Sequence, residues 1–415
     1  MKEIKLGEVL DVKRGTSLSG KFYENSGTYI RLTLGNFTYP ECGWKDNTSK
    51  DDLYYSGDFK NEYLLKKDDI ITPLTEQVRG LLGNTARIPE SDLYIQSGDI
   101  GKIIPFEKLL DKNFAYYLVS SPIVKKQLDA ASQQTKIRHT SPDAIKNCIA
   151  FIPELASQKK IANLLDSLNK KISTNNCIIS ELESLAKTIY DYWFLQFEFP
   201  NEDGKPYKSS GGKMVWNEEL KREIPEGWKV GNLYDIAEFI NGLACQKFRP
   251  IDEVHKLPVI KIGEMHNGIR SETEWARDDV PEKNKIDYGD ILFSWSATLE
   301  TMLWNMGKGV LNQHIFKVIP KKYNKYYVYQ QLSAYIINFV KMAETRKTTM
   351  GHITTDHLKQ SRIPLPPNKI SDKYGSTVSS IFEKYLLCSK ENQELASLRD
   401  FLLPMLMNGQ VTFKD

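Results

Sequence analysis

The chain repeats one pattern twice, and this repetition constrains its fold more than any other feature. The segments 154–194 and 371–409 each place residues on one helical stripe at alternating spacings of four and three, and most of these residues are apolar. Ile161 corresponds to Tyr374, 213 residues later, and the two registers then coincide. Weaker matches continue upstream in the same order: Asp69 with Asp290, and Leu6 with Leu233. Because the order is kept while the displacement drifts smoothly, we interpret the chain as one internal duplication, with too few copies for a solenoid.

The two patterned segments predict long helices of the coiled-coil type. Heptads with apolar a and d positions favour helices that pack along one seam. Pro153 and Pro200 flank the first helix, as expected at helix ends. A helix of about 38 residues is roughly 57 Å long, and the nearest partner for its stripe is the other helix. Antiparallel pairing predicts a pseudo-two-fold molecule with its two globular parts a fixed distance apart.

Two aspects of this helix pair stay open at the level of sequence. Asn175 and Asn392 fall on the seam, where a buried asparagine can fix the register at some loss of stability. The alternative is that both lie where the seam is exposed. Each helix can also be an ordinary core helix packed on its own domain, which its length and sustained period disfavour.

Each predicted helix follows a globular segment of mixed character. Short apolar runs such as YIRL, DIITPL and GKIIPF, bounded by Gly, Pro and Asp, predict strands. Helical stretches follow around 112–130 and 324–343, which gives an α/β (α+β) fold in two copies. The polar stretch 201–213 is predicted to be a surface loop or linker between the copies. The predicted boundaries are 1–153 for the first domain, 154–196 for the central helix, 197–217 for the linker loop, 218–369 for the second domain and 370–410 for the C-terminal helix.

Composition restricts where and how the chain can act. Its net charge is only +3, so affinity for nucleic acid must come from local patches or from partners. The five cysteines form no C-x-x-C pair, the N-terminus has no apolar signal-peptide core, and no run of about 18 apolar residues occurs. We expect a cytoplasmic protein with reduced thiols and no membrane span.

Motifs in the second copy carry a family resemblance. They are Ile224-Pro-Glu-Gly-Trp228, Asp290-Ile-Leu-Phe-Ser-Trp-Ser-Ala297, Leu311-Asn-Gln-His-Ile-Phe-Lys317, Thr348-Thr-Met-Gly-His-Ile353 and Ile363-Pro-Leu-Pro-Pro367. In this order, the chain resembles the specificity subunit of type I restriction-modification enzymes. Each motif alone is weak, but their order and the duplication together make the match specific over essentially the whole chain.

The resemblance implies a function and a set of partners. Such a subunit carries two target recognition domains joined by the two helices, and binds a bipartite, asymmetric target in double-stranded DNA. It positions two adenine-N6 methyltransferase subunits and, in the full complex, two ATP-dependent restriction subunits that translocate DNA. S-adenosylmethionine, ATP and Mg then belong to the partners. No membrane is involved.

The first copy departs from the motifs of the second. It has Thr72-Pro-Leu-Thr75 where the second has Ser-Trp-Ser-Ala, and Gln96-Ser-Gly-Asp99 where the second has Leu-Asn-Gln-His. The two domains are therefore expected to read different sequences, which fits an asymmetric target.

Patterns typical of catalytic sites are absent from the sequence. It contains no G-x-x-x-x-G-K-[ST] loop, no G-x-G-x-x-G and no N/D-P-P-[YF] tetrad for a flipped adenine. His352 and His357 form the one close histidine pair, and no His/Cys cluster surrounds them. We expect a non-catalytic chain that holds no metal and no cofactor of its own.

The candidate DNA contacts are basic and polar residues in loops at equivalent places of the two copies. Arg and Lys can bind guanine or phosphate, Gln can pair with adenine, and Ser, Thr and His reach either; a glycine permits close approach of the backbone. The candidates are Lys13, Arg14, Gln134, Thr135, Lys136, Arg138, His139, Lys247, Arg249, Ser294, Ser296, Arg346, Lys347, Thr348, Thr349, Gly351 and His352. The competing interpretation is a solvated basic loop, and for Trp295 a core position rather than base stacking.

Two other functions remain alternatives. The chain could be a self-contained methyltransferase or nuclease with degraded motifs, which binding of S-adenosylmethionine to the isolated chain would support. It could also be a protein scaffold without DNA contacts, which indifference of the full complex to DNA sequence would favour.

Overall fold

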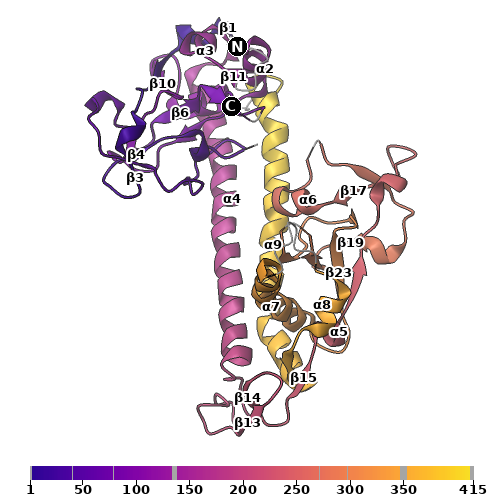
Figure 1. The fold of residues 1–415 in the computed structure, drawn as a ribbon. Helices are drawn as coiled ribbons and strands as arrows, with labels where there is room; N and C mark the ends of the chain where they lie inside the picture. The colour runs from indigo at the N-terminus through magenta and orange to yellow at the C-terminus, as the bar shows by residue number, and fades with distance from the viewer. Residues whose placement is uncertain are drawn as a thin grey trace. The chain divides into compact units, whose positions relative to one another are not determined.

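The computed structural model describes residues 2–39, 41–77, 79–132, 138–270, 272–296, 298–345 and 353–411 (Figure 1). Two compact units divide the chain: unit 1 is Met1–Lys170 with Leu395–Asp415, and unit 2 is Lys171–Glu394. Both long helices therefore contribute to both units. We call the globular part of unit 1, residues 2–152, head 1, and that of unit 2, residues 229–365, head 2.

Head 1 is built on a four-stranded antiparallel sheet with the order β2-β10-β6-β8. A smaller sheet has the order β3-β5-β4-β9, and two further pairs are β1-β12 and β7-β11. The strands are β1 Lys2–Lys5, β2 Leu10–Arg14, β3 Tyr23–Glu24, β4 Ile30–Arg31, β5 Tyr54–Tyr55, β6 Ile70–Pro73, β7 Thr75–Glu76, β8 Ala86–Arg87, β9 Tyr94–Ile95, β10 Ile100–Pro105, β11 Arg138–His139 and β12 Ile149–Ile152. The helices are α1 Lys112–Val119, α2 Pro122–Ala131 and α3 Pro142–Asn147.

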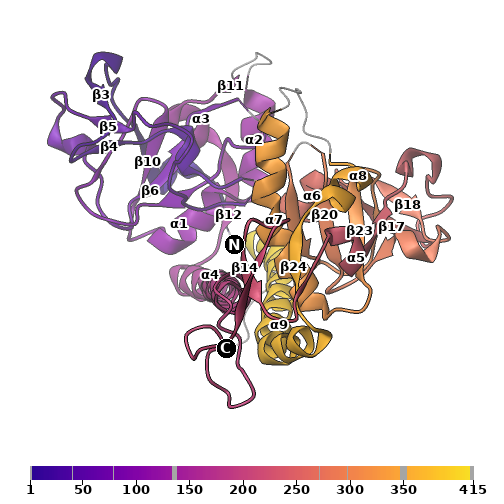
Figure 2. The same cartoon turned by 60° about the horizontal axis from the view of Figure 1, so that its bottom comes forward.

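Head 2 repeats this plan with a main sheet of order β16-β23-β20-β21, beside which α7 packs (Figure 2). A second sheet has the order β18-β17-β22-β19, and β15 pairs with β24. The strands are β15 Lys229–Gly231, β16 Ala237–Asn241, β17 Lys256–Ile260, β18 Trp275–Arg277, β19 Lys285–Ile286, β20 Ile291–Ser294, β21 Glu300–Leu303, β22 Gly309–Leu311, β23 Ile315–Pro320 and β24 Ile363–Leu365. The helices are α5 Leu233–Ile236, α6 Ile262–Asn267, α7 Lys325–Thr345 and α8 Thr355–Gln360.

Matching contacts in the two heads confirm the predicted duplication. The register of β2 on β10 recurs as the register of β16 on β23. Equivalent side-chain contacts recur as well. The ion pair of Lys102 with Asp69 (2.6 Å) matches that of Lys317 with Asp290 (2.9 Å). The hydrogen bond from the N–H of Asp111 to the Gln158 side chain (2.8 Å) matches the one from the N–H of Asn324 to the Ser371 hydroxyl (2.9 Å). In both copies the same ion pair therefore joins the last strand of the main sheet in the chain, β10 or β23, to the residue just before β6 or β20.

The helical stretch after the main sheet differs between the heads. In head 2 it is the single helix α7. In head 1 it is broken at Ser120 and Ser121, and Pro122 begins α2. Proline fits the first turn of a helix but cannot continue one, since it lacks the N–H that the preceding turn needs.

The two predicted long helices are confirmed as α4, Leu155–Tyr190, and α9, Asn368–Met407. Within unit 2 they run antiparallel, because the Tyr374 hydroxyl reaches the Ala186 carbonyl (3.4 Å) while Asn175 reaches Glu391. Apolar residues of α4 also belong to the cores of the units, so each helix packs on globular parts as well as on its partner. The distance between the two heads stays a prediction.

The asparagines on the seam form a polar layer within unit 2. Asn175 is 1% exposed, and its amide donates to Glu391 Oε2 (2.8 Å) and Asn392 Oδ1 (3.0 Å). Lys171 contacts the same Glu391 oxygen at 3.1 Å. The interpretation that Asn175 lies on an exposed part of the seam is therefore wrong, while its role in fixing the register stays a prediction.

Helix α4 ends in an aromatic cluster of unit 2. A single π-helical turn, Asp191–Leu195, follows it and buries Trp193 and Phe194. The stretch 201–213 is largely exposed, but Tyr207 stacks on Phe199 with ring centroids 4.6 Å apart. A hairpin of β13, Met214–Asn217, and β14, Arg222–Pro225, then leads into head 2.

Across the described ranges, none of the helices has the length and apolarity needed to cross a membrane. The five cysteines are free thiols.

Candidate nucleic-acid interface

Three strands of head 1 meet at one end of its main sheet. The register pairs Arg14 with Gly101 and Pro73 with Ile100, so the ends of β2 and β6 lie beside the start of β10. Immediately beyond β6, β7 pairs with β11. We call this region the loop end of head 1. It brings Lys13 and Arg14, near the N-terminus, to the same end of the sheet as the residues of β11.

The exposed candidates at the loop end of head 1 are Lys13, Arg14 and His139. Buried Gln96 braces this end, since its amide donates to the carbonyls of Lys13 (2.7 Å) and Ile100 (3.0 Å). The remaining loop candidates of the first copy, Gln134, Thr135 and Lys136, lie outside the described residues.

The same three strands meet at the loop end of head 2. There Asn241 ends β16, Ser294 ends β20 and pairs with Ile315, and Ile315 begins β23. Ser294 is fully buried and its hydroxyl donates to the Ser296 carbonyl (3.3 Å), while Ser296 is also buried. Burial of both side chains favours a structural role over base contacts. The candidates Arg346, Lys347, Thr348, Thr349, Gly351 and His352 lie outside the described residues.

Trp295 holds the loop end of head 2 together. Its half-buried ring donates from Nε1 to Asn241 Oδ1 (3.2 Å) and lies 5.5 Å from the His314 ring. Its carbonyl accepts from the N–H of Ile353 (3.1 Å), as the Leu74 carbonyl of head 1 accepts from Thr140 (2.8 Å). These contacts support the interpretation of Trp295 as a core residue.

Lys247 and Arg249 lie apart from the other candidates of head 2. Both are exposed in the loop after β16. Between them, the Phe248 carbonyl accepts from the N–H of Arg277 on β18 (2.9 Å), so this loop is held by the second sheet. Any DNA contact made here would extend the surface beyond the loop end of the main sheet.

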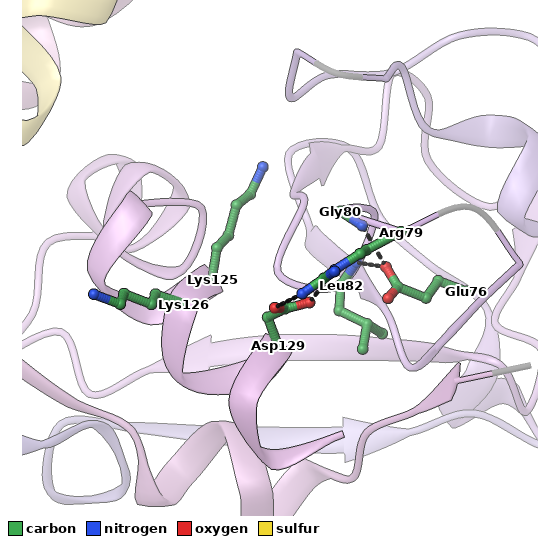
Figure 3. Close-up of a pocket in the computed structure, with 7 residues that line it drawn as sticks. All are labelled: Glu76, Arg79, Gly80, Leu82, Lys125, Lys126 and Asp129. Carbon is green, nitrogen blue, oxygen red and sulfur yellow. Dashed lines mark hydrogen bonds and ion pairs between the residues drawn. The ribbon is translucent and has the colours of Figure 1, made fainter. Parts of the chain in front are cut away.

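Arg138 is held by carboxylates instead of facing solvent. Its Nη1 lies 2.9 Å from Glu76 Oε1 and 2.7 Å from Asp129 Oδ1. Asp129 also contacts Arg79 at 2.6 Å (Figure 3). The hydrogen bonds from Arg79 and then from Arg138 lower the pKa of Asp129 to about 2. This carboxylate therefore stays charged at neutral pH and holds both guanidinium groups.

A pocket of about 260 Å³ in head 1 adjoins this cluster (Figure 3). Its lining residues are Glu76, Arg79, Gly80, Leu82, Lys125, Lys126 and Asp129. The ammonium group of Lys125 donates to the Asn84 amide oxygen, while Lys126 is exposed. The pocket is thus lined by three basic side chains and two carboxylates.

Glu76, Arg79 and Asp129 were missed as site residues by the sequence analysis. Their signal is weak, because Arg79 and Asp129 are 50 residues apart and belong to no common motif. The acidic partner of a basic loop residue becomes visible only when the strands pair.

Comparison with known sequences places these features in a family. The family model described as "Type I restriction modification DNA specificity domain" matches residues 1–184 and 225–397. The specificity subunit of the type I restriction enzyme MjaIX from Methanocaldococcus jannaschii is 22% identical over 357 residues, covering 81% of this chain and 79% of that protein. The HindI specificity subunit from Haemophilus influenzae is 23% identical over 377 residues, covering 77% and 82%.

A solved structure has the same fold. The S subunit of a type I restriction-modification system from M. genitalium aligns with a TM-score of 0.59 at 15% sequence identity, covering 98% of this chain and 96% of that one. At this level of identity the similarity concerns the fold.

Proposed function

The chain belongs to the type I restriction-modification DNA specificity family, and on that basis we propose that it recognises a bipartite, asymmetric target in double-stranded DNA. The loop end of head 1 reads one half of the target and the loop end of head 2 reads the other. The observation that carries this proposal is the equivalent register of the same three strands in both heads, which gives each head a loop end built on the same plan.

The asymmetry of the target follows from the different residues at the two loop ends. The strand registers shift the sequence match by one residue, so that Pro73 is equivalent to Ser294 and Leu74 to Trp295. Where head 1 has exposed Arg14 and buried Leu74, head 2 has Asn241 and half-buried Trp295. Base contacts depend on the type and position of each side chain, so two heads with the same backbone plan and different side chains select different sequences.

We further propose that the chain positions two adenine-N6 methyltransferase subunits, and restriction subunits in the full complex, without catalysing a reaction itself. Large apolar side chains stay exposed on the long helices: Leu185, Leu387, Leu398 and Phe401. Exposed apolar surface of this kind favours protein partners. S-adenosylmethionine, ATP and Mg are assigned to those partners, and within the described ranges no group of three His, Cys, Asp or Glu side chains could hold a metal.

Mapping adenine methylation in cells tests the proposal directly. Cells carrying the cognate methyltransferase subunit are compared with and without this chain. We expect a new bipartite motif only when the chain is present, and replacement of residues 1–150 by the matching domain of another specificity subunit should change one half of it. An unchanged methylation pattern, with the partner expressed and bound, would contradict the proposal.

Replacing Lys13 and Arg14 together by alanine is expected to weaken binding of the complex to cognate and non-cognate DNA alike. Each lost phosphate contact lowers the slope of log Kobs against log salt by about 0.9. The measurement is DNA affinity at several salt concentrations. The matched control is Lys66→Ala with Lys67→Ala, which removes two exposed charges before the start of β6, at the other end of that strand. Equal slopes for both double variants would exclude phosphate contacts by Lys13 and Arg14.

A further inference from the structure

One arginine joins three structural elements of head 1. Besides its contacts with Glu76 and Asp129 Oδ1, the guanidinium of Arg138 donates from Nη2 to the Asp129 carbonyl (2.7 Å) and to the Ser132 hydroxyl. Asp129 lies in α2, and Ser132 directly follows the end of this helix. Glu76 lies in β7, and Arg138 is the first residue of β11. The arginine therefore ties the end of α2 to the β7-β11 pair.

The partner of Arg138 is fixed even more firmly than the arginine. Glu76 is 1% exposed, and its Oε2 accepts from the N–H groups of Gly80 (3.0 Å), Leu81 (2.8 Å) and Leu82 (2.9 Å). Its other oxygen is left for Arg138. A buried carboxylate that holds a turn through three backbone groups cannot move without disrupting that turn, so it gives Arg138 a rigid reference point.

This geometry leaves Arg138 poorly suited to direct base contact. Its side chain is 14% exposed, and both terminal nitrogens are engaged by acceptors of head 1. Binding guanine would require it to leave two carboxylates, one of them buried, and an unpaired buried charge is strongly unfavourable.

We propose that Arg138 is a positioning residue for base selection by head 1 and does not itself contact a base. This inference rests on the proposed function, and it assigns the contacts to neighbouring candidates. The exposed candidate His139 directly follows Arg138 in β11, and Lys13 and Arg14 are exposed at the same loop end. One guanidinium therefore fixes the strand from which His139 is presented. Displacing such supports by about 1 Å can lower a site's efficiency about 100-fold.

The sequence predicts no equivalent of this ion pair in head 2. At the displacements that relate the two copies, Glu76 corresponds to Ala297 and Arg138 to Gly351. Neither residue type can form an ion pair, so the half of the target read by head 2 provides an internal control.

The test measures the methylated motif and the DNA affinity of the complex for Arg138→Met and for Glu76→Gln. We expect several positions of the first half-site to lose discrimination together, by about 10- to 100-fold, while the second half-site and the salt slope stay unchanged. Glu76→Gln should produce the same defect although Glu76 is buried, and Arg138→Lys should restore part of the selectivity. The matched control is Arg87→Met, which breaks a structural pair with Asp166 (2.9 Å) in the same unit.

Three outcomes would overturn the inference. Loss of discrimination at a single base pair, with Glu76→Gln normal, would make Arg138 a base reader. A slope of log Kobs against log salt that is lower by about 0.9 in Arg138→Met would identify Arg138 as a phosphate contact. An equal loss of half-site selectivity in Arg87→Met would reduce its role to general stability of head 1. If the unaltered chain directs no methylation at all, the proposed function fails instead, so the two failures are distinguishable.

Discussion

Replacing Phe194 by alanine is expected to destabilise unit 2 by about 3–5 kcal/mol, the usual range for a buried phenylalanine. Phe194 is 2% exposed and lies where α4 ends. Its ring centroid is 4.8 Å from that of Tyr327 and 5.1 Å from that of Tyr374. These rings come from the π-helical turn after α4, from α7 and from α9, so the cavity would loosen the junction between head 2 and both long helices.

Denaturant unfolding of the full chain, followed by tryptophan fluorescence, measures this loss. Of the seven tryptophans, Trp44 alone lies outside unit 2, so the signal reports that unit. The matched control is Leu387→Ala, also in unit 2, in which the side chain is 59% exposed and the expected change is within about 0.5 kcal/mol. A change below about 1 kcal/mol for Phe194→Ala would mean that the aromatic cluster does not hold the junction.

The sequence predicted the long helices closely because their signal is local. An alternation of four and three sustained from 154 to 194 predicts the helix observed at Leu155–Tyr190. The π-helical turn that follows could not be anticipated, because Trp193 continues the heptad pattern while tertiary packing sets the local backbone. The duplication was also accessible, since matching short motifs recur in order and their contacts recur with them.

The candidate site was less predictable, because residue type does not indicate what a side chain contacts. Arg138 stands in a basic loop by sequence, and only the pairing of β7 with β11 reveals its partner Glu76. Ser294 looks like a polar reader beside Trp295, yet all four residues of β20 are buried. Both cases depend on contacts between segments far apart in the chain, which periodicity does not report.

Replacing Gly15 or Gly242 by alanine is expected to disable one head and spare the other. A Cβ at Gly242 would lie 2.1 Å from the Asn312 carbonyl oxygen, and one at Gly15 would lie 2.3 Å from that of Ser97. Both contacts are with backbone, so the strand ends must separate, at about 2–3 kcal/mol. These glycines occupy equivalent places at the two loop ends, where the N–H of Gly15 donates to the Ile100 carbonyl (3.0 Å) and that of Gly242 to Ile315 (3.1 Å).

Methylation mapping with the intact complex reads out each head separately. Gly15→Ala should lower the selectivity for the half-site of head 1 by about 100-fold and leave the selectivity for that of head 2 unchanged. Gly242→Ala should do the reverse. The matched controls are Gly20→Ala, whose Cβ would meet Tyr23 at an ordinary 3.8 Å, and Gly263→Ala, whose Cβ would meet nothing within 4 Å. If either loop-end variant weakened both half-sites equally, the heads would not read DNA independently. The two glycines meet the same steric requirement in the two copies. Reciprocal defects would therefore show that each loop end recognises one half of the target.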